Sequence, residues 1–84
     1  MIVLLLKSNK KTDIYKIIAK NIKKYRLYNH LTQEELAKAS GYSYSFIRKL
    51  EGPNSPKNFS IQTLYELACT LNVDIKKLFE GTDI

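Results

Sequence analysis

The chain has 84 residues, of which 44% are apolar and 26% charged, with three glycines and two prolines. This length suits one small globular domain and excludes a multidomain enzyme. A deep catalytic cavity would take up much of so small a core, so the length favours a binding module over an enzyme.

Positive charge is concentrated at one end of the chain. The net charge is +6; residues 1–26 carry eight lysines and arginines against one acid, whereas residues 27–84 carry six against seven acids. Such a basic surface attracts polyanions, either nucleic acid or an anionic membrane. A solvated lysine-rich helix face is the alternative interpretation of the same pattern.

Cys69 is the only cysteine, so no disulfide can form within the chain. With a single histidine besides, there is no cluster of metal-binding side chains, and we expect no metal and no cofactor. A free cysteine fits a reducing cytoplasm, which is the expected location. The apolar run at residues 2–6 is too short to cross a bilayer, so we expect no signal peptide and no membrane partner.

Residues 1–12 are predicted to be an N-terminal extension, followed by a helix over about 13–28. Within the extension, residues 2–6 could add an edge strand to a partner, cover the core or remain without fixed structure. Thr12 is expected to cap the helix, with Asp13 at the positive end of the helix dipole. Asn29 is expected to end it in the left-handed conformation. The predicted inward stripe is Ile14, Ile18, Ile22 and Tyr25.

Two short helices with a tight turn between them follow. Thr32 and Glu35 have the spacing of a capping box, which predicts a helix over 33–39. The Ser40-Gly41 pair breaks that helix, and Ser43 can cap the next one, which runs to Glu51 before Gly52-Pro53. Two short helices joined by a glycine-containing turn form a helix-turn-helix.

The segment 52–58 is predicted to be a loop, because it is rich in glycine, proline, asparagine and serine. Ser60 is expected to cap a helix over 61–71, Asn72 to end it, and Asp74 to cap a last helix over 75–80. Residues 81–84 are a predicted C-terminal tail. The inward positions of these two helices are Ile61, Leu64, Leu67, Ala68, Leu71, Leu78 and Phe79.

From about Ile14 to Phe79, the sequence resembles the phage repressor/Cro (XRE-type) helix-turn-helix DNA-binding domains. The resemblance rests on Leu31-Thr32-Gln33-Glu34-Glu35-Leu36-Ala37, on Gly41 at the turn, on Ile47 and Leu50 facing inward, and on the run from Ile61 to Asp74. It implies an all-α fold, a compact five-helix lambda-repressor-like domain over residues 13–80 with the helix-turn-helix in its second and third helices.

The resemblance also implies roles for individual residues. The helix after the turn would read base edges while the preceding helix lies across the phosphates. Lysine and arginine favour guanine, whereas serine discriminates little. For the loop residues, a solvated turn is the alternative. The base-reading candidates are Tyr44, Ser45, Arg48 and Lys49, and the phosphate-contacting candidates are Thr32, Gln33, Asn54, Ser55, Lys57 and Asn58.

Other residues are expected to support this surface. Ala37 and Gly41 allow the two helices to approach and turn tightly. Arg26 and Glu51 match a charge pair that, in the family, ties the first helix to the end of the third. Tyr42 stands where the family usually has a small aliphatic residue, and we expect it in the core with its hydroxyl at the surface. Phe46 is expected to pack on the loop or on the helix over 61–71, rather than to stack on bases.

The function that the resemblance implies is transcriptional regulation by sequence-specific binding to double-stranded DNA. A homodimer on a near-palindromic operator is expected, acting as a repressor or controller of bacterial, phage or mobile-element origin. The stretch from Lys7 to Lys11 could then be a flexible arm that follows the DNA backbone, and the sequence alone does not decide this. An antitoxin-like module that binds another protein is the alternative, and no enzymatic activity is expected. The candidates for dimer contacts are Tyr65, Cys69, Asn72, Val73 and Ile75.

Overall fold

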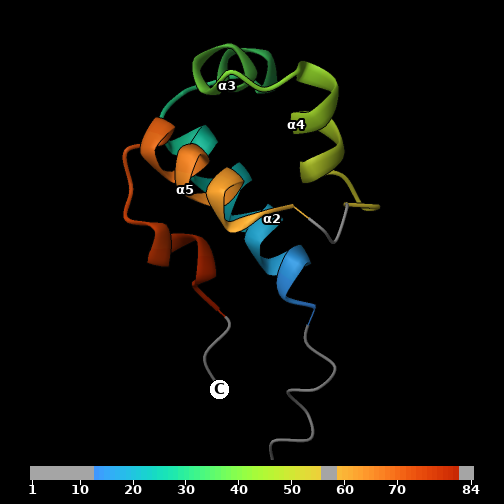
Figure 1. The fold of residues 1–84 in the computed structure, drawn as a ribbon, viewed down its shortest axis with the longest axis vertical. Coiled ribbons are helices and arrows are strands. Elements are labelled where there is room, and N and C mark those ends of the chain that lie inside the picture. Colours follow the sequence, from blue (N-terminus) through green and yellow to red (C-terminus); the bar gives the residue numbers. More distant parts are fainter. Residues whose placement is uncertain (1–12, 56–58, 82–84) are drawn as a thin grey trace, which may run out of the picture.

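The computed structural model describes residues 13–55 and 59–81, and these residues form helices and turns without a strand (Figure 1). The all-α prediction is therefore confirmed, whereas the predicted last α-helix is a 3-10 helix. The predictions for residues 1–12 and for the tail beyond Gly81 lie outside the described residues. The elements are α2 (Ile14–Tyr28), α3 (Gln33–Ser40), α4 (Tyr44–Glu51), α5 (Ile61–Thr70) and η1 (Ile75–Phe79).

The helices cross one another around a shared core. In Figure 1, α3 lies across one end of the molecule, α4 descends beside it, and α5 passes in front of α2. α2 packs against η1 and α4, while α3 packs against α4 and α5. None of the described helices is long and apolar enough to cross a bilayer.

The core draws side chains from every helix. Ile18 and Ile22 of α2 are buried as predicted, but Ile14 is 40% exposed and Ile61 is 72% exposed, so their predicted inward placement is wrong. Each is the first residue of its helix, and side chains tilt toward the helix N-terminus, which carries them past the end of the packed surface. The main buried cluster is Ile18, Ile22, Leu36, Ala37, Ile47, Leu50, Leu64, Leu67, Ala68, Leu71 and Leu78.

Most helix caps follow the prediction. The Thr32 hydroxyl accepts from the Glu35 amide at 3.0 Å, and the Glu35 carboxylate accepts from the Thr32 amide at 2.8 Å, which completes the capping box. Ser43, Ser60 and Asp74 cap α4, α5 and η1. Each cap satisfies an amide that the first helical turn leaves unpaired.

The two ends of α2 differ from the prediction by one residue each. Asp13, and not Thr12, is the N-cap, since its carboxylate accepts from the amides of Tyr15 and Lys16 at 3.1 and 3.3 Å. At the other end, His30 has the left-handed backbone, with φ of 58°, whereas Asn29 has φ of −88°.

Hydrogen bonds from the Asn29 side chain explain why the left-handed residue after α2 is His30 and not Asn29. The Asn29 amide donates to the carbonyls of Tyr25 and Leu71 at 2.7 and 3.0 Å, which satisfies the end of α2 and joins it to the end of α5. The chain then reverses at the next residue. Asn72, in contrast, has the predicted left-handed backbone after α5, with φ of 60°.

α2 and η1 are joined by polar contacts that the sequence analysis did not predict. The buried Asn21 amide donates to the carbonyls of Leu78 and Glu80 at 2.8 and 2.9 Å. The Glu80 carboxylate accepts from the Tyr25 hydroxyl at 2.6 Å and pairs with Lys24 at 3.2 Å. The Tyr25 hydrogen bond, aided by Lys24, holds the pKa of Glu80 below its ordinary value. η1 is thereby fixed across α2.

Candidate nucleic-acid interface

The turn between α3 and α4 depends on one glycine conformation. Gly41 has φ of 84°, a left-handed backbone that side chains disfavour. Its amide and that of Tyr42 both donate to the Ala37 carbonyl, at 2.9 and 3.1 Å. Among the described residues, no atom lies within 4 Å of where a Cβ on Gly41 would stand, so the backbone angle alone favours glycine here.

The outer face of α4 brings together the four predicted base-reading side chains. Ile47 and Leu50 have no exposed surface and hold the inner face of α4 against the core. The side chains at 44, 45, 48 and 49 are all exposed. The Arg48 guanidinium lies 5.5 Å from the centre of the Tyr44 ring, a cation–π contact one turn along the helix.

Arg26 and Glu51 form a buried, two-pronged ion pair. Arg26 Nε lies 2.7 Å from Glu51 Oε2, and Nη2 lies 2.9 Å from Oε1. The third guanidinium nitrogen, Nη1, donates to the Leu31 carbonyl at 2.7 Å. The Arg26 and Glu51 side chains are only 8% and 2% exposed. The pair therefore ties α2 to the end of α4.

Gln33, the predicted phosphate contact, joins this same network. Its side-chain amide donates to Glu51 Oε1 at 3.0 Å, so its orientation is set by the end of α4. The Thr32 hydroxyl is occupied by the capping box. Among the described residues, every buried side-chain nitrogen and oxygen has a hydrogen-bond partner. The Thr32 and Gln33 side chains at the start of α3 are therefore held by hydrogen bonds, and Gln33 is held against the end of α4.

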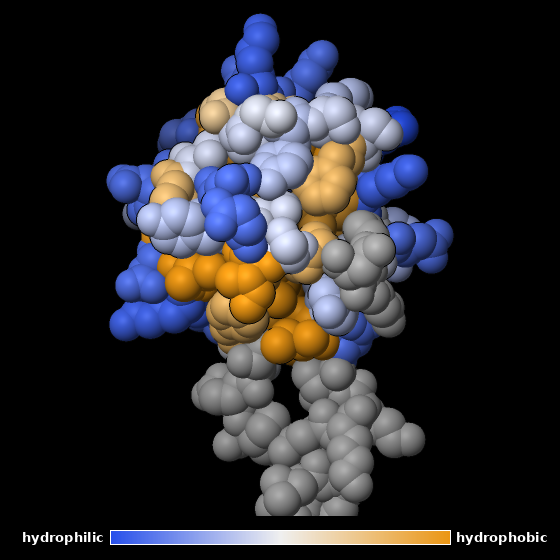
Figure 2. Space-filling model, viewed as in Figure 1, coloured by the Kyte–Doolittle hydropathy of each residue, from blue (hydrophilic) through white to orange (hydrophobic). Residues whose placement is uncertain are grey.

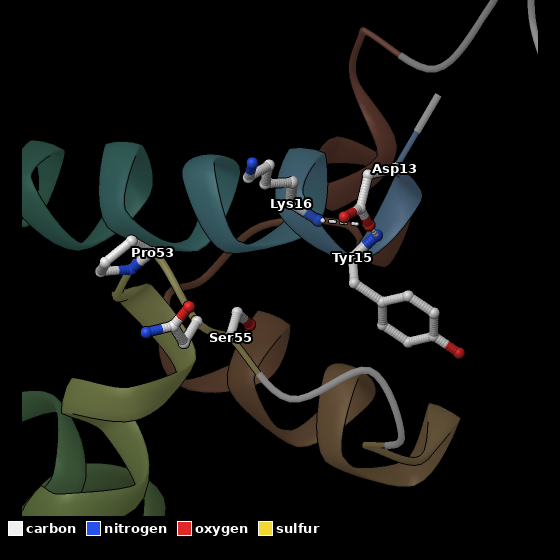
Figure 3. Close-up of a pocket in the computed structure, with 6 residues that line it drawn as sticks. Asp13, Tyr15, Lys16, Pro53 and Ser55 are labelled. Carbon is white, nitrogen blue, oxygen red and sulfur yellow. Dashed lines mark hydrogen bonds between the residues drawn. The ribbon is translucent and has the colours of Figure 1, made fainter. Parts of the chain in front are cut away.

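The loop after α4 separates two open hollows. One, of about 210 Å³, is lined by Arg48, Lys49 and residues 52–54. The other, of about 320 Å³, lies between the first turn of α2 and the loop, and includes Lys16, Asn54 and Ser55 (Figure 3). Asn54 is exposed and Ser55 half-buried, while the predicted contacts Lys57 and Asn58 lie outside the described residues.

A third hollow, which the sequence does not predict, lies between α4 and the start of α5. It has a volume of about 670 Å³ and is lined by the caps of both helices, by Lys49 and by aromatic rings. The two cap serines are the only local sequence signal for it, because the loop that brings the helices together has no regular pattern. Its lining residues are Gly41, Tyr42, Ser43, Phe46, Lys49, Phe59, Ser60 and Thr63.

Tyr42 and Phe46 form one wall of this hollow. Both are half-buried and pack against the core, and their rings stack with centroids 5.0 Å apart. The Tyr42 ring lies inside with its hydroxyl directed to α5, where it donates to Glu66 Oε1 at 2.6 Å. Phe46 thus packs on a neighbouring aromatic ring of the turn.

The predicted dimer contacts divide into two groups. Tyr65, Cys69 and Asn72 are exposed, whereas Val73 and Ile75 are half-buried and pack against the core. A hydrogen bond with the Cys69 thiol raises the pKa of Tyr65. Figure 2 shows apolar surface gathered on this side of the molecule around η1. The exposed face of α5 therefore stands next to an apolar area.

The described residues hold no candidate metal site. Nowhere in 13–55 and 59–81 do three histidine, cysteine, aspartate or glutamate side chains come together. His30 is exposed in the turn after α2.

Comparisons with known proteins agree on one kind of domain. The family profile HTH_3, described as Helix-turn-helix, matches residues 22–78. Control protein C.SmaI of Serratia marcescens is 39% identical over 66 residues, covering 79% of this chain and 76% of that protein. HTH-type transcriptional regulator y4dJ of Sinorhizobium fredii is 37% identical over 71 residues, covering 84% of this chain and 90% of that protein.

A solved structure adds the same fold at greater distance in sequence. The restriction-modification controller protein C.AhdI of Aeromonas hydrophila superposes with a TM-score of 0.69 at 26% identity, covering 77% of this chain and 96% of that one.

Proposed function

The chain belongs to the XRE-type helix-turn-helix family of DNA-binding transcriptional regulators, and from this premise we propose that it binds a near-palindromic operator as a homodimer. The exposed outer face of α4 carries the proposal. Four polar or aromatic side chains stand on it, while two fully buried ones fix the helix from behind. A helix presented in this way fits the major groove, where each base pair has a distinct hydrogen-bonding pattern.

The chemistry of this face suits base reading. Arg48 and Lys49 can donate to guanine O6 and N7, and the Ser45 hydroxyl can donate or accept. Tyr44, held beside Arg48, limits the freedom of the guanidinium. We assign sequence preference to these four side chains, Tyr44, Ser45, Arg48 and Lys49.

Phosphate contacts would position the domain without reading sequence. The start of α3 suits this role, because a helix N-terminus favours anions and the Gln33 amide is held there by Glu51. Thr32 and the loop residues Asn54, Ser55, Lys57 and Asn58 are proposed to contact phosphates as well.

The homodimer is proposed to form through the exposed face of α5 and the corner that follows it. Tyr65, Cys69 and Asn72 would make the contact, with Val73 and Ile75 beneath them. Two-fold symmetry then places two α4 helices in successive major grooves, roughly 34 Å apart. Relatives named as control or controller proteins favour a repressor or restriction-modification controller that acts by occupying its operator.

Selection from a random duplex library at physiological salt tests the proposal, since non-specific binding weakens steeply with salt. We expect a two-fold symmetric motif to be enriched. Lys49→Ala and Ser45→Ala should change the selected sequence, whereas Gln33→Ala should weaken all duplexes about equally. Lys23→Ala, which removes the same charge from the exposed face of α2, is the matched control and should select the wild-type motif.

Two outcomes would contradict the proposal. If the library shows no enrichment, sequence-specific binding fails, and a module that binds another protein becomes the better interpretation. If Lys49→Ala, Ser45→Ala and Gln33→Ala all reduce binding uniformly without changing the motif, α4 is not the reading helix.

A further inference from the structure

Tyr42 makes a polar contact that crosses from the helix-turn-helix to α5. Its hydroxyl donates to Glu66 Oε1 at 2.6 Å and lies 3.1 Å from Thr63 Oγ1. The other oxygen of Glu66 accepts from the Gln62 amide at 2.9 Å. The hydrogen bonds from Tyr42 and Gln62 hold the pKa of Glu66 below its ordinary value. The acceptor is therefore a fixed, ionised carboxylate, and bonds of this kind are short and strong.

The same tyrosine supports the first turn of α4. Tyr42 directly precedes the cap residue Ser43, and its ring stacks on Phe46 with an angle of 30° between the planes. Of the buried anchors of α4, Ile47 is the last residue of the first half of the helix and Leu50 lies in the second half. The residues before Ile47, which include Tyr44 and Ser45, are supported from the side by the Tyr42–Phe46 stack.

Direct packing of α4 against α5 does not supply this support for the first turn of α4. α4 packs mainly on α2 and α3, and the aromatic-lined hollow of about 670 Å³ lies between it and the start of α5. The Tyr42 hydroxyl reaches α5 at one side of that hollow. Its hydrogen bond to Glu66 is thus a specific link between α5 and the turn that precedes α4.

Glu66 lies on the helix to which we assign dimer contacts. Tyr65 is its neighbour in the chain, and Cys69 lies less than one turn further along α5. Residues next to each other in a helix point in directions about 100° apart, so Glu66 faces the turn while Tyr65 faces outward. The Tyr42–Glu66 bond therefore relates the start of α4 to the proposed dimer surface.

We propose that Tyr42 and Glu66 are positioning residues for operator recognition, which fix the angle of the first turn of α4 relative to α5 and so relative to the α4 of the second subunit. This inference rests on the proposed function. Base contacts need donors and acceptors placed within hydrogen-bonding distance, whereas phosphate contacts tolerate more variation in angle. Loss of the link should thus reduce binding to the operator and leave binding to unrelated duplexes unchanged.

The test compares two tyrosine variants that lose equivalent bonds. Tyr42→Phe removes the hydroxyl and keeps the ring stack, while Tyr25→Phe removes the 2.6 Å bond to Glu80 between α2 and η1. Affinity for the selected operator and for an unrelated duplex would be measured at one salt concentration. We expect Tyr42→Phe to weaken operator binding about 10-fold with less than about 2-fold change on the unrelated duplex, where 10-fold corresponds to about 1.4 kcal/mol. Tyr25→Phe should change neither affinity.

A second variant and a second readout separate positioning from general loss of stability. Glu66→Gln keeps an acceptor without the charge and should lose less affinity than Glu66→Ala. The Tyr42→Phe/Glu66→Ala double variant should be no worse than either single variant, because both remove the same bond. Selection with Tyr42→Phe should also accept a wider range of half-site spacings.

The possible results separate a failure of this inference from a failure of the proposed function on which it rests. If the wild-type chain enriches no duplex, the proposed function and this inference fail together. If the wild-type chain enriches an operator and Tyr42→Phe binds it as tightly, only this inference fails. Equal losses of operator affinity in Tyr42→Phe and Tyr25→Phe would likewise overturn it, because the effect would then come from weakened folding.

Discussion

Glu51 is the acceptor on which three helices converge. It ends α4, pairs with Arg26 of α2 and accepts from Gln33 of α3. Buried pairs add little net stability, because the desolvation cost of both charges offsets their attraction. Their value lies in orientation, since the guanidinium and carboxylate accept only a narrow range of geometries. One carboxylate thus helps to orient α2, α3 and α4 relative to one another.

Removing that carboxylate leaves a buried charge without a partner. We expect Glu51→Ala to lower the free energy of unfolding by about 3–5 kcal/mol, measured by urea denaturation. Glu34→Ala, at an exposed position in the first turn of α3, is the control and should change it by about 0.5 kcal/mol or less. Equal effects of the two variants would show that the Arg26 pair does not organise the fold.

At the scale of elements, η1 is attached to α2 through a carboxylate that titrates. Tyr25 and Lys24 lower the folded-state pKa of Glu80, so the unfolded chain binds a proton at higher pH than the folded chain does. The contribution of Glu80 to stability is therefore complete above the ordinary pKa of glutamate. It is lost as the pH falls from there through the lower, folded-state pKa.

Melting temperatures between neutral and acid pH test this linkage. Glu80→Gln should melt lower than the wild-type chain at neutral pH, and the difference should shrink as the pH falls below the ordinary range of glutamate. When both chains also carry Tyr25→Phe, the difference in melting temperature between them should be smaller, because the Tyr25 hydrogen bond is the main cause of the pKa shift of Glu80. A constant difference at all pH values would contradict the role of the carboxylate charge.

Elements with local signals could be predicted from the sequence, and long-range contacts could not. Each N-cap side chain accepts from an amide within three residues of its own position, so the local sequence was enough to predict the caps Thr32, Ser43, Ser60 and Asp74. Where two adjacent residues have similar N-cap propensities, the local pattern predicted the wrong one. Asp13 rather than Thr12 caps α2, because a carboxylate there reaches two amides.

The candidate site shows the same division. The amphipathic pattern of α4 alone predicted which of its side chains are exposed, whereas the Arg26–Glu51 pair was predicted only through the family resemblance. The Tyr42–Glu66 bond joins residues 24 positions apart, and the Asn21 contacts span 57 and 59 positions. No periodicity or cap signal connects residues at such separations, so only the assembled fold reveals these contacts.

At the scale of the whole molecule, the proposed dimer is the arrangement on which operator symmetry depends. We expect Tyr65→Asp to sediment as a monomer and to lose operator affinity, because a carboxylate would be buried in an apolar contact. Tyr28→Asp makes the same change at the end of α2, where the side chain is 79% exposed, and should leave the sedimentation unchanged. A dimeric Tyr65→Asp would place the subunit contact elsewhere.

The attachment of η1 across α2 has a consequence for the order of events during synthesis. α2 is made early, yet the buried Asn21 amide finds its acceptors only at Leu78 and Glu80. A nascent chain can form the α3–α4 turn locally, but the face of α2 that packs on η1 stays open to water and to proteases until those residues leave the ribosome. Completion of the DNA-binding domain is thus coupled to synthesis of the chain through Glu80, and a chain stopped before residue 78 would be a substrate for degradation rather than a partial regulator.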